Sequence, residues 1–229
     1  IEPGKTPIYN DPKLETISVT FRDIDYLMYV YVHEEGNPKP AKSNPTIIDS
    51  IFVNYHLGYF KDSLDYIPLQ KLESATWFNP TGIGVEGWLH GFTKFKGGEN
   101  ITSNGPITYK GNGNGILFIP SGLAYRNGGN NGLPPNANLV YYVNLFDLVE
   151  ETDHDNDGVS SFLEDIDGDG DPRNDDTDGD FISNLADPDD DGDGILTKDE
   201  DANGDGNPAN DFSDPNNPTL PDYLNPDIK

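Results

Sequence analysis

The sequence predicts an α+β fold for about the first 150 residues, followed by a mostly irregular acidic array. Short segments rich in β-branched and aromatic residues indicate strands, one segment has apolar residues at helical spacing, and an aspartate-rich motif recurs after residue 152. The charge of the 229-residue chain is divided in the same way. Residues 1–150 carry 15 acidic and 11 basic residues, a net charge of −4, whereas residues 151–229 carry 26 and 3, a net charge of −23.

The expected elements follow from local patterns along the chain. Residues 1–14 are rich in proline and polar residues and are expected to form a tether, followed by a domain over residues 15–150. Strands are predicted at residues 17–21, 26–33, 48–59, 116–119 and 139–148. Residues 61–80 fit neither the strand nor the helix pattern.

One helix is predicted over residues 85–95, and two glycines at 97 and 98 end it. Its apolar residues recur at helical spacing, at Val85, Trp88, Leu89, Phe92 and Phe95. Residues 100–115 are rich in glycine and asparagine and are expected to be an inserted loop. Composition changes at residues 149–152, which separates the first domain from a module over residues 151–229.

Composition excludes several kinds of protein and site. Nucleic-acid binding depends on Lys and Arg, and this chain has only 14 of them against 41 Asp and Glu, so it does not resemble a nucleic-acid-binding protein. No apolar run is long enough to span a membrane. The absence of cysteine excludes disulfides, thiolate metal sites and cysteine nucleophiles. The chain begins at Ile1 rather than Met, so we expect it to be processed or trimmed, with any signal peptide or lipid-anchoring residue upstream.

Residues 153–164 match the twelve-residue calcium loop of EF-hands, and residues 189–200 match it equally well. In the first loop the ligand positions 1, 3, 5, 7 and 12 are held by Asp153, Asp155, Asp157, Val159 and Glu164. In the other they are held by Asp189, Asp191, Asp193, Ile195 and Glu200. Calcium prefers six to eight oxygen ligands, and alternate residues of a tight loop can point their carboxylates inward. The pattern therefore predicts bound calcium.

Three weaker copies accompany these loops. The second copy consists of Asp165, Asp167, Asp169 and Asp171, with Asp176 at position 12. The third consists of Asp176, Asp178, Asp180, Ile182 and Asp187, with Phe181 where glycine belongs. The last consists of Asp201, Asn203 and Asp205, closed by Asp211 or Asp214. The five copies follow at steps of 12, 11, 13 and 12 residues. This regular spacing argues against the alternative, an acidic disordered tail.

The long helices that flank each loop of an EF-hand are missing from this pattern. The array over residues 153–214 therefore resembles thrombospondin type 3 repeats, in a cysteine-free bacterial version. This resemblance implies several structural Ca²⁺ ions, which themselves form the core of the module.

Four segments of the first domain agree in order and approximate spacing with another family. They are residues 53–59 (VNYHLGY), 87–92 (GWLHGF), 118–125 (FIPSGLAY) and 133–145 (LPPNANLVYYVNL). Over residues 50–149 the chain resembles the FKBP-type peptidyl-prolyl cis-trans isomerases. The resemblance implies a curved antiparallel sheet wrapped on one short helix, isomerisation of X–Pro bonds, and proline-containing polypeptides as partners.

The same resemblance implies a pocket of named residues. Trp88 forms its floor, and its walls are Tyr55, Val85, Leu133 and Tyr141, with a further wall from Trp77 or Phe78. Tyr125 offers its hydroxyl to the substrate carbonyl. The family usually has a Phe-Asp pair after the first pocket strand, and this sequence departs from it: Tyr66 is the candidate to replace the aromatic residue, and Asp65 or Asp62 the acid. An insertion at residues 100–115 and Arg126 in place of glycine are further departures.

Together these observations favour an extracytoplasmic prolyl isomerase with a calcium-stabilised module. Extracellular calcium modules work at a Kd of roughly 10⁻⁴ to 10⁻³ M, a concentration found outside the cytosol. We expect a lipoprotein of the bacterial periplasm or outer membrane surface. Two alternatives remain: a non-catalytic, calcium-dependent peptide- or surface-binding protein on a decayed isomerase fold, and a calcium-dependent structural spacer.

Overall fold

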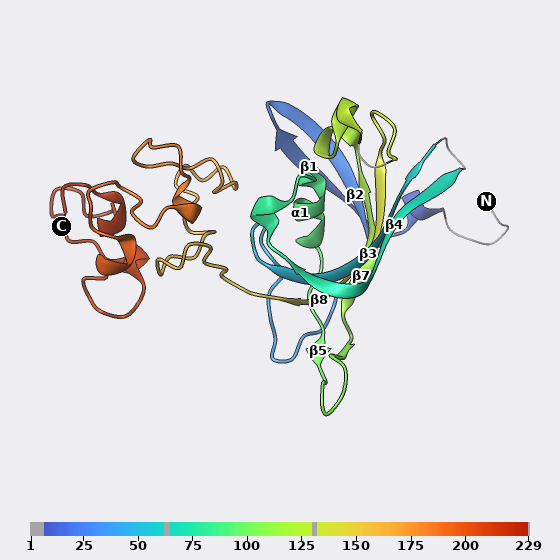
Figure 1. Cartoon of the computed structure of the whole chain (residues 1–229), viewed down its shortest axis with the longest axis horizontal. Helices are drawn as coiled ribbons and strands as arrows, with labels where there is room; N and C mark the ends of the chain where they lie inside the picture. Colours follow the sequence, from blue (N-terminus) through green and yellow to red (C-terminus); the bar gives the residue numbers. More distant parts are fainter. Residues whose placement is uncertain (1–6, 62–64, 130–131, 229) are drawn as a thin grey trace. The chain divides into compact units, whose positions relative to one another are not determined.

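The computed structural model describes residues 7–61, 65–129 and 132–228. It divides the chain into two compact units, Ile1–Glu150 and Glu151–Lys229 (Figure 1). The division falls where the composition of the sequence becomes strongly acidic. Of the expected N-terminal tether, residues 1–6 lie outside the described residues, and β1 begins at Leu14.

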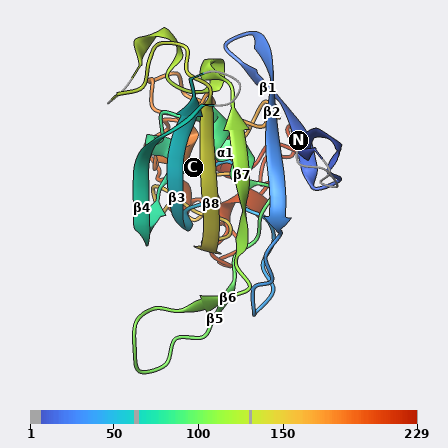
Figure 2. The same cartoon turned by 90° about the vertical axis from the view of Figure 1, so that its right-hand side faces the viewer.

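The first unit is built on a six-stranded antiparallel sheet. Its strands are β1 (Leu14–Phe21), β2 (Ile24–Glu34), β3 (Ile51–Phe60), β4 (Tyr66–Phe78), β7 (Gly113–Ile119) and β8 (Leu139–Leu148). They lie in the order β1-β2-β7-β8-β3-β4, and every neighbouring pair is antiparallel (Figure 2). A short separate pair is formed by β5 (Glu99–Asn100) and β6 (Tyr109–Lys110). The α+β prediction of an antiparallel sheet with one helix is confirmed.

Strand β4 occupies the segment that fitted no simple pattern. It pairs only with β3 and lies at the edge of the sheet, where Pro68 is tolerated because its missing N–H breaks no ladder bond. Two register shifts interrupt the pairing, between Val53 and Tyr55 and between Leu57 and Gly58. Each shift breaks the alternation of side chains, and this explains why the sequence of β4 does not alternate.

The expected loop at residues 100–115 is only partly a loop. It contains β6, and β7 begins at Gly113, earlier than the strand predicted at residues 116–119. The sequence does not indicate the start of this strand, because Gly113 and Gly115 have no side chains that could show an alternation of apolar and polar residues. A Cβ atom at position 115 would lie only 2.8 Å from the ring of Phe95. The glycine is therefore required by close packing.

Helix α1 (Glu86–Phe92) packs against the sheet face that carries the buried residues. Two glycines allow its close approach to β7: a Cβ atom at Gly87 would meet Ile119 at 2.5 Å, and one at Gly91 would meet Leu117 at 2.7 Å. Trp88 and Phe92 project from the helix into the core, with ring centroids 4.6 Å apart. The helix is shorter than the predicted 85–95, because Val85 is extended and Thr93 caps the end.

The second unit has neither strand nor α-helix among its described residues. It contains four short 3₁₀ turns, η5 (Asn184–Ala186), η6 (Thr197–Asp199), η7 (Pro208–Asn210) and η8 (Asp222–Leu224). Its hydrophobic cluster is small and joins distant parts of the sequence: Val159 packs with Tyr223 and Leu224. In the described parts of the whole chain, none of the helices has the length and apolarity needed to cross a membrane.

A chain that ends at Glu150 is expected to fold without the second unit. The core cluster contains only residues from Val19 to Leu148, and every strand ends by Leu148. Far-UV circular dichroism should show a cooperative thermal transition for the shortened protein. Aggregation, or melting without a cooperative transition, would show that the first unit needs residues beyond Glu150.

Candidate functional site

The first candidate site is a cavity of about 170 Å³ in the first unit. Elements far apart in the sequence supply its lining, which consists of Tyr55, Phe78, Ile83, Gly84, Val85, Trp88, Tyr125 and Tyr141. Tyr55 comes from β3, Phe78 from β4, Trp88 from α1 and Tyr141 from β8. No carboxylate is among these lining residues, so the cavity is aromatic and uncharged.

Edge-on ring contacts hold the aromatic walls in place. The ring of Tyr55 lies 5.4 Å from that of Tyr141 and 6.3 Å from that of Trp88, measured between centroids. Phe78 meets Trp88 at 5.2 Å with the planes at 69°. Such arrangements are the favoured geometry for aromatic pairs and add to the stabilisation from burial. Trp88 is almost fully buried, and its indole N–H has no hydrogen-bond partner among the described residues.

Three tyrosines converge on this cavity. Burial raises the pKa of the Tyr141 phenol, and the neighbouring phenols of Tyr125 and Tyr55 raise it further. Burial likewise raises the pKa of Tyr55, again with a contribution from Tyr125. The phenols of Tyr55 and Tyr141 therefore stay neutral at physiological pH and can act as hydrogen-bond donors.

The structure brings together five of the eight residues predicted for the pocket: Tyr55, Val85, Trp88, Tyr125 and Tyr141. Leu133 is buried in the same hydrophobic core. Of the two alternatives for the further wall, Phe78 lines the cavity and Trp77 does not, so the assignment of Trp77 to the pocket is wrong. Phe78 pairs with Ile51 and faces the core, whereas Trp77 pairs with Phe52 on the opposite face and is 48% exposed.

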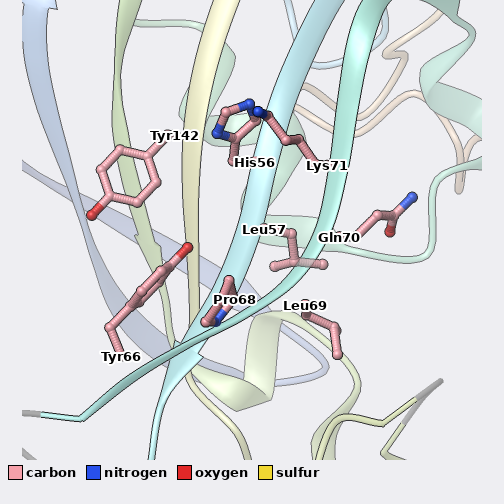
Figure 3. Close-up of a pocket in the computed structure, with 8 residues that line it drawn as sticks. All are labelled: His56, Leu57, Tyr66, Pro68, Leu69, Gln70, Lys71 and Tyr142. Carbon is pink, nitrogen blue, oxygen red and sulfur yellow. The ribbon is translucent and has the colours of Figure 1, made fainter.

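The assignment of Tyr66 to the pocket is also wrong, because Tyr66 does not line the cavity. It pairs with Phe60 and lies on the outer face of the sheet, where its ring meets that of Tyr142 at 5.9 Å (Figure 3). Asp65, one of the two expected acids, is exposed and absent from the cavity lining. The other, Asp62, lies outside the described residues.

The outer face also carries a larger hollow of about 450 Å³. Figure 3 shows its lining side chains, which come from β3, β4 and β8. The hollow is open, and the side chains of His56 and Lys71 at its border are about half exposed. The smaller aromatic cavity is the better candidate site, because Val85, Trp88 and Tyr141 in its lining are buried and its aromatic walls are held by ring contacts.

The second candidate site is the acidic array. Its five loops share one conformation in the predicted register. In each loop the position-6 N–H donates to the position-1 carboxylate, at 2.7–3.2 Å. In each loop the position-7 N–H donates to the position-5 carboxylate, at 2.7–3.0 Å. Val159, Ile182 and Ile195 are three of these position-7 residues.

Position 6 adopts a positive φ in all five loops. Glycine supplies it in four of them, with φ between 88° and 98° at Gly158, Gly170, Gly194 and Gly206. Phe181 holds the position in the third loop with φ of 79°, although a side chain disfavours this conformation. The loop geometry is therefore maintained even where the sequence lacks its glycine.

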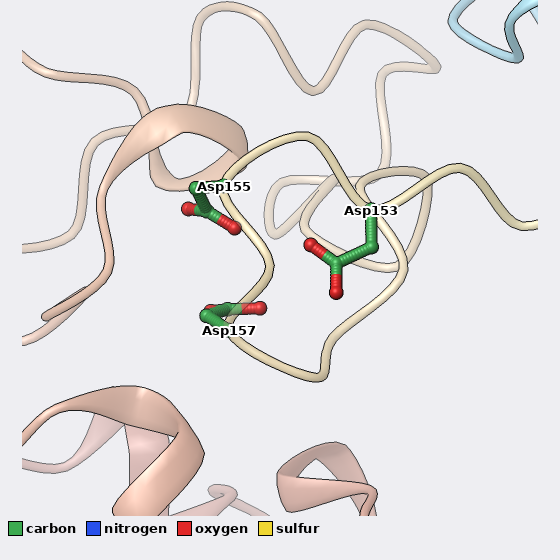
Figure 4. Close-up of side chains that lie close together, drawn as sticks. All are labelled: Asp153, Asp155 and Asp157. Atoms are coloured by element: carbon green, nitrogen blue, oxygen red, sulfur yellow. The ribbon is translucent and has the colours of Figure 1, made fainter.

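The loops bury carboxylate oxygens that no donor reaches. Asp153, Asp155 and Asp157 bring one ligand atom each within 4.8 Å of the others, and Figure 4 shows their carboxylates around one loop. Similar groups form at Asp165, Asp167 and Asp169, at Asp176, Asp178 and Asp180, and at Asp189, Asp191 and Asp193. Oxygens of Glu164 and Glu200 are buried without a hydrogen-bond partner in the described parts of the chain. An all-oxygen donor set of this kind fits calcium.

Burial also changes the acidity of these groups. It raises the pKa of Glu200 to about 8, with further contributions from the charges of Asp191 and Asp193. Burial and the charge of Asp157 raise the pKa of Asp155 to about 7. These carboxylates are therefore destabilised when charged, and a bound cation would offset the cost.

The residue that closes each loop differs in part from the prediction. Glu164, Asp187 and Glu200 are buried at position 12 as expected. In the second loop Asp175 replaces Asp176: its Oδ1 accepts from the N–H of Asp167, and Asp176 serves only to open the third loop. The shorter step of 11 residues explains this shift by one position.

Further side-chain contacts involve the second and last loops. The side chain of Asp171 is engaged by Arg173, with an Nη2–Oδ2 distance of 2.7 Å. In the last loop, which starts at Asp201, Asp211 is the one of the two predicted closing residues that accepts from the N–H of Asn203, and it is buried. The amide of Asn203 donates to Asn210, and Asp205 accepts from Asn210 at 3.0 Å.

Comparison with known proteins gives structural similarities alone. None of the protein-family models matches this chain. No curated protein matches it either. FkpA from Escherichia coli is similar with 26% identity and a TM-score of 0.41, over 53% of this chain and 47% of FkpA, so this chain matches about half the length of FkpA.

Two further solved structures are similar to this chain. The N-terminal domain of FKBP42 from Arabidopsis thaliana has 19% identity and a TM-score of 0.43, covering 64% of this chain and 100% of that one. A peptidyl-prolyl cis-trans isomerase from Pseudomonas syringae pv. tomato has 16% identity and a TM-score of 0.43, covering 62% and 85%. All of these TM-scores lie below 0.5, so the site has to be judged on its own geometry.

In calcium-free solution, the second unit is expected to be most stable near pH 4.5 and to lose stability as pH rises toward 8, so that without calcium it unfolds near neutral pH. The folded state raises the pKa of Glu200 from 4.5 to about 8, so between these values the folded chain holds a proton that the unfolded chain has lost. Thermal unfolding at several pH values measures this dependence. Glu200→Gln should make it shallower, whereas Asp199→Asn, at an exposed neighbour, should not. Equal slopes in all three proteins would contradict the assignment.

Proposed function

We propose that the first unit is a peptidyl-prolyl cis-trans isomerase that acts on X–Pro bonds of extracytoplasmic proteins. One observation carries the proposal. Five residues that the sequence resemblance assigns to the isomerase pocket come from separate segments, and they line one uncharged cavity. Chance placement of aromatic residues in a core would not be expected to gather this set around an open space.

The reaction suits such a cavity. The barrier to rotation of a peptide bond, about 18–20 kcal/mol, comes from amide resonance, so no nucleophile is required. The twisted amide is less polarised than the planar one, and an aromatic cavity that excludes water favours it. The proline ring would rest on Trp88, while the hydroxyl of Tyr125 would donate to the substrate carbonyl.

In a second candidate function, the same cavity binds peptides but does not catalyse their isomerisation. Among the described residues, which do not include Asp62, no carboxylate lines the cavity, whereas the family usually places an acid after the first pocket strand. This observation favours a calcium-dependent peptide- or surface-binding protein on a decayed isomerase fold. Proline peptides would then bind without being isomerised, and a turnover assay separates the two functions.

The proposal for the second unit is a calcium-stabilised module of the thrombospondin type 3 kind. The ligand set would be the carboxylates of the five loops, with backbone carbonyls at position 7. Loops of this kind work at a Kd of roughly 10⁻⁴ to 10⁻³ M, which suits an extracytoplasmic site such as the bacterial periplasm or outer membrane surface, with lipid anchoring upstream. Cell fractionation that recovers the protein from the cytosol would contradict this placement.

Replacement of Trp88 is expected to lower isomerase activity strongly. Trp88→Leu should reduce kcat/KM on a proline peptide by about tenfold or more, equivalent to roughly 1.4 kcal/mol of transition-state stabilisation. The matched control is Trp77→Leu on the opposite face of the sheet, which should keep its activity. Activity should also change little between pH 6 and 8, since the described residues that line the cavity include neither a carboxylate nor a histidine. Full activity of Trp88→Leu in a folded protein would place the chemistry elsewhere.

Chelation of calcium by EGTA is expected to unfold the second unit. Each site filled at 100 times its Kd contributes about 2.7 kcal/mol, so several sites dominate a unit with one small hydrophobic cluster. Limited proteolysis should then cut residues 151–229 rapidly, and calcium should restore protection. The chain that ends at Glu150 provides the control and should be insensitive to EGTA. Unchanged protease resistance of the full chain would refute the calcium module.

A further inference from the structure

Two acidic loops that are distant in the sequence meet at three buried carboxylates in the second unit. Asp157 and Glu164 belong to the loop that starts at Asp153, and Asp190 belongs to the loop that starts at Asp189. Each offers one ligand oxygen, and these oxygens all lie within 4.8 Å of one another. The exposed fractions are 1% for Asp157, 0% for Glu164 and 1% for Asp190.

Each of these carboxylates has at least one buried oxygen without a hydrogen-bond partner among the described residues. Both carboxylate oxygens of Glu164 are buried without a hydrogen-bond partner in the described parts of the chain. Asp157 uses Oδ1 to accept from the N–H of Val159, which leaves Oδ2 buried and unpaired. Asp190 uses Oδ2 to accept from the hydroxyl of Thr197, which leaves Oδ1 buried and unpaired. Buried oxygens that lack donors are costly, so their concentration at one point indicates a ligand.

The chain itself offers little positive charge to this cluster. Residues 151–229 contain three basic residues. Arg173 is engaged with Asp171, Lys198 is exposed, and Lys229 lies outside the described residues. The cluster must therefore take up either protons or an external cation.

Asp190 has no place in the ligand pattern of its own loop. It occupies position 2, which supplies no ligand in the twelve-residue pattern. The equivalent residue of the first loop is His154, which forms hydrogen bonds with Ser161. The carboxylate of Asp190 is therefore available to another site, and one of its oxygens lies within 4.8 Å of a carboxylate oxygen of Glu164.

We propose that Asp157, Glu164 and Asp190 hold one calcium ion together, so that this ion ties the first loop to the fourth loop. The inference rests on the proposed calcium module. Three carboxylates with unpaired oxygens form a hard, all-oxygen site, which suits calcium better than softer metals. The site lies next to the small hydrophobic cluster, where Val159 packs against Tyr223. Calcium would thus join distant segments of the second unit and would not only order each loop separately.

The test is calcium binding by the full chain, measured by equilibrium dialysis and calorimetry. Asp190→Asn keeps the size of the side chain and removes its charge. It should abolish one calcium ion or weaken one site by at least about tenfold, equivalent to roughly 1.4 kcal/mol. Asp199→Asn removes the same charge at an exposed position of the same loop and should bind calcium like the original chain. If Asp190→Asn also binds like the original chain, the cross-loop site is refuted while the calcium module stands.

A second variant distinguishes one shared site from two separate ones. Glu164→Gln alone, and Glu164→Gln with Asp190→Asn, should each lose no more than the single ion that Asp190→Asn loses. Loss of two ions in the double variant would show that the residues serve different sites and would overturn the proposal. If the original chain binds no calcium, the calcium module itself fails, and the cross-loop site fails with it.

Terbium luminescence gives a readout local to this site. Tyr223 is the sole tyrosine of residues 151–229. It packs with Val159, two residues after Asp157, so it lies close to the proposed site. Terbium added to the full chain should emit through Tyr223. The emission should fall in Tyr223→Phe and in Asp190→Asn, and it should persist in Asp199→Asn. Undiminished emission from Asp190→Asn would overturn the proposal.

Discussion

Buried carboxylate charge is the constraint on which the structure of residues 151–229 depends. A carboxylate can leave water only if a donor, a proton or a cation compensates it. Here the loop backbone compensates one set of oxygens, through the repeated bonds from positions 6 and 7. A second set, including both oxygens of Glu164 and Glu200, is buried without such bonds. The stability of this conformation therefore depends on the protons or cations that neutralise these unpaired carboxylate oxygens.

The first unit follows the opposite physical rule. Its core is apolar, and the contacts around Trp88 are between aromatic rings. Burial of this kind needs no bound ion, so the sheet and helix can form a stable core from their own side chains. The cavity beside Trp88 is a local gap in that packing, lined by Tyr55, which contacts Tyr141 edge-on and Phe78 with tilted rings.

The apolar core of the first unit and the buried carboxylates of the second unit suit different functions. An uncharged aromatic cavity can favour a less polar form of a bound peptide group, which is the requirement for prolyl isomerisation. A set of acidic loops can respond to the calcium concentration, since occupied sites add to stability by mass action. If Asp190 links the first and fourth loops, that response becomes cooperative across the second unit, because one ion would then join two loops.

The sequence by itself determined the local features. The repeat spacing placed all five acidic loops in the register that the structure has, since each loop is fixed by bonds between residues five or fewer positions apart. The alternation and helical spacing of apolar residues located five strands and the helix. The resemblance to the isomerase family assigned eight residues to the pocket, and five of them line the cavity in the structure.

Only the tertiary structure decided what depends on distant pairing. Trp77 and Phe78 are adjacent and both aromatic, and which of them faces the core depends on the register of β4 against β3, which is shifted twice. The same pairing sends Tyr66 to the outer face. Asp190 appears in its own loop as a non-ligand, and its position beside Glu164 follows from how the second unit folds back on itself. A local pattern carries no information on such contacts, because the residues that make them are far apart in the chain.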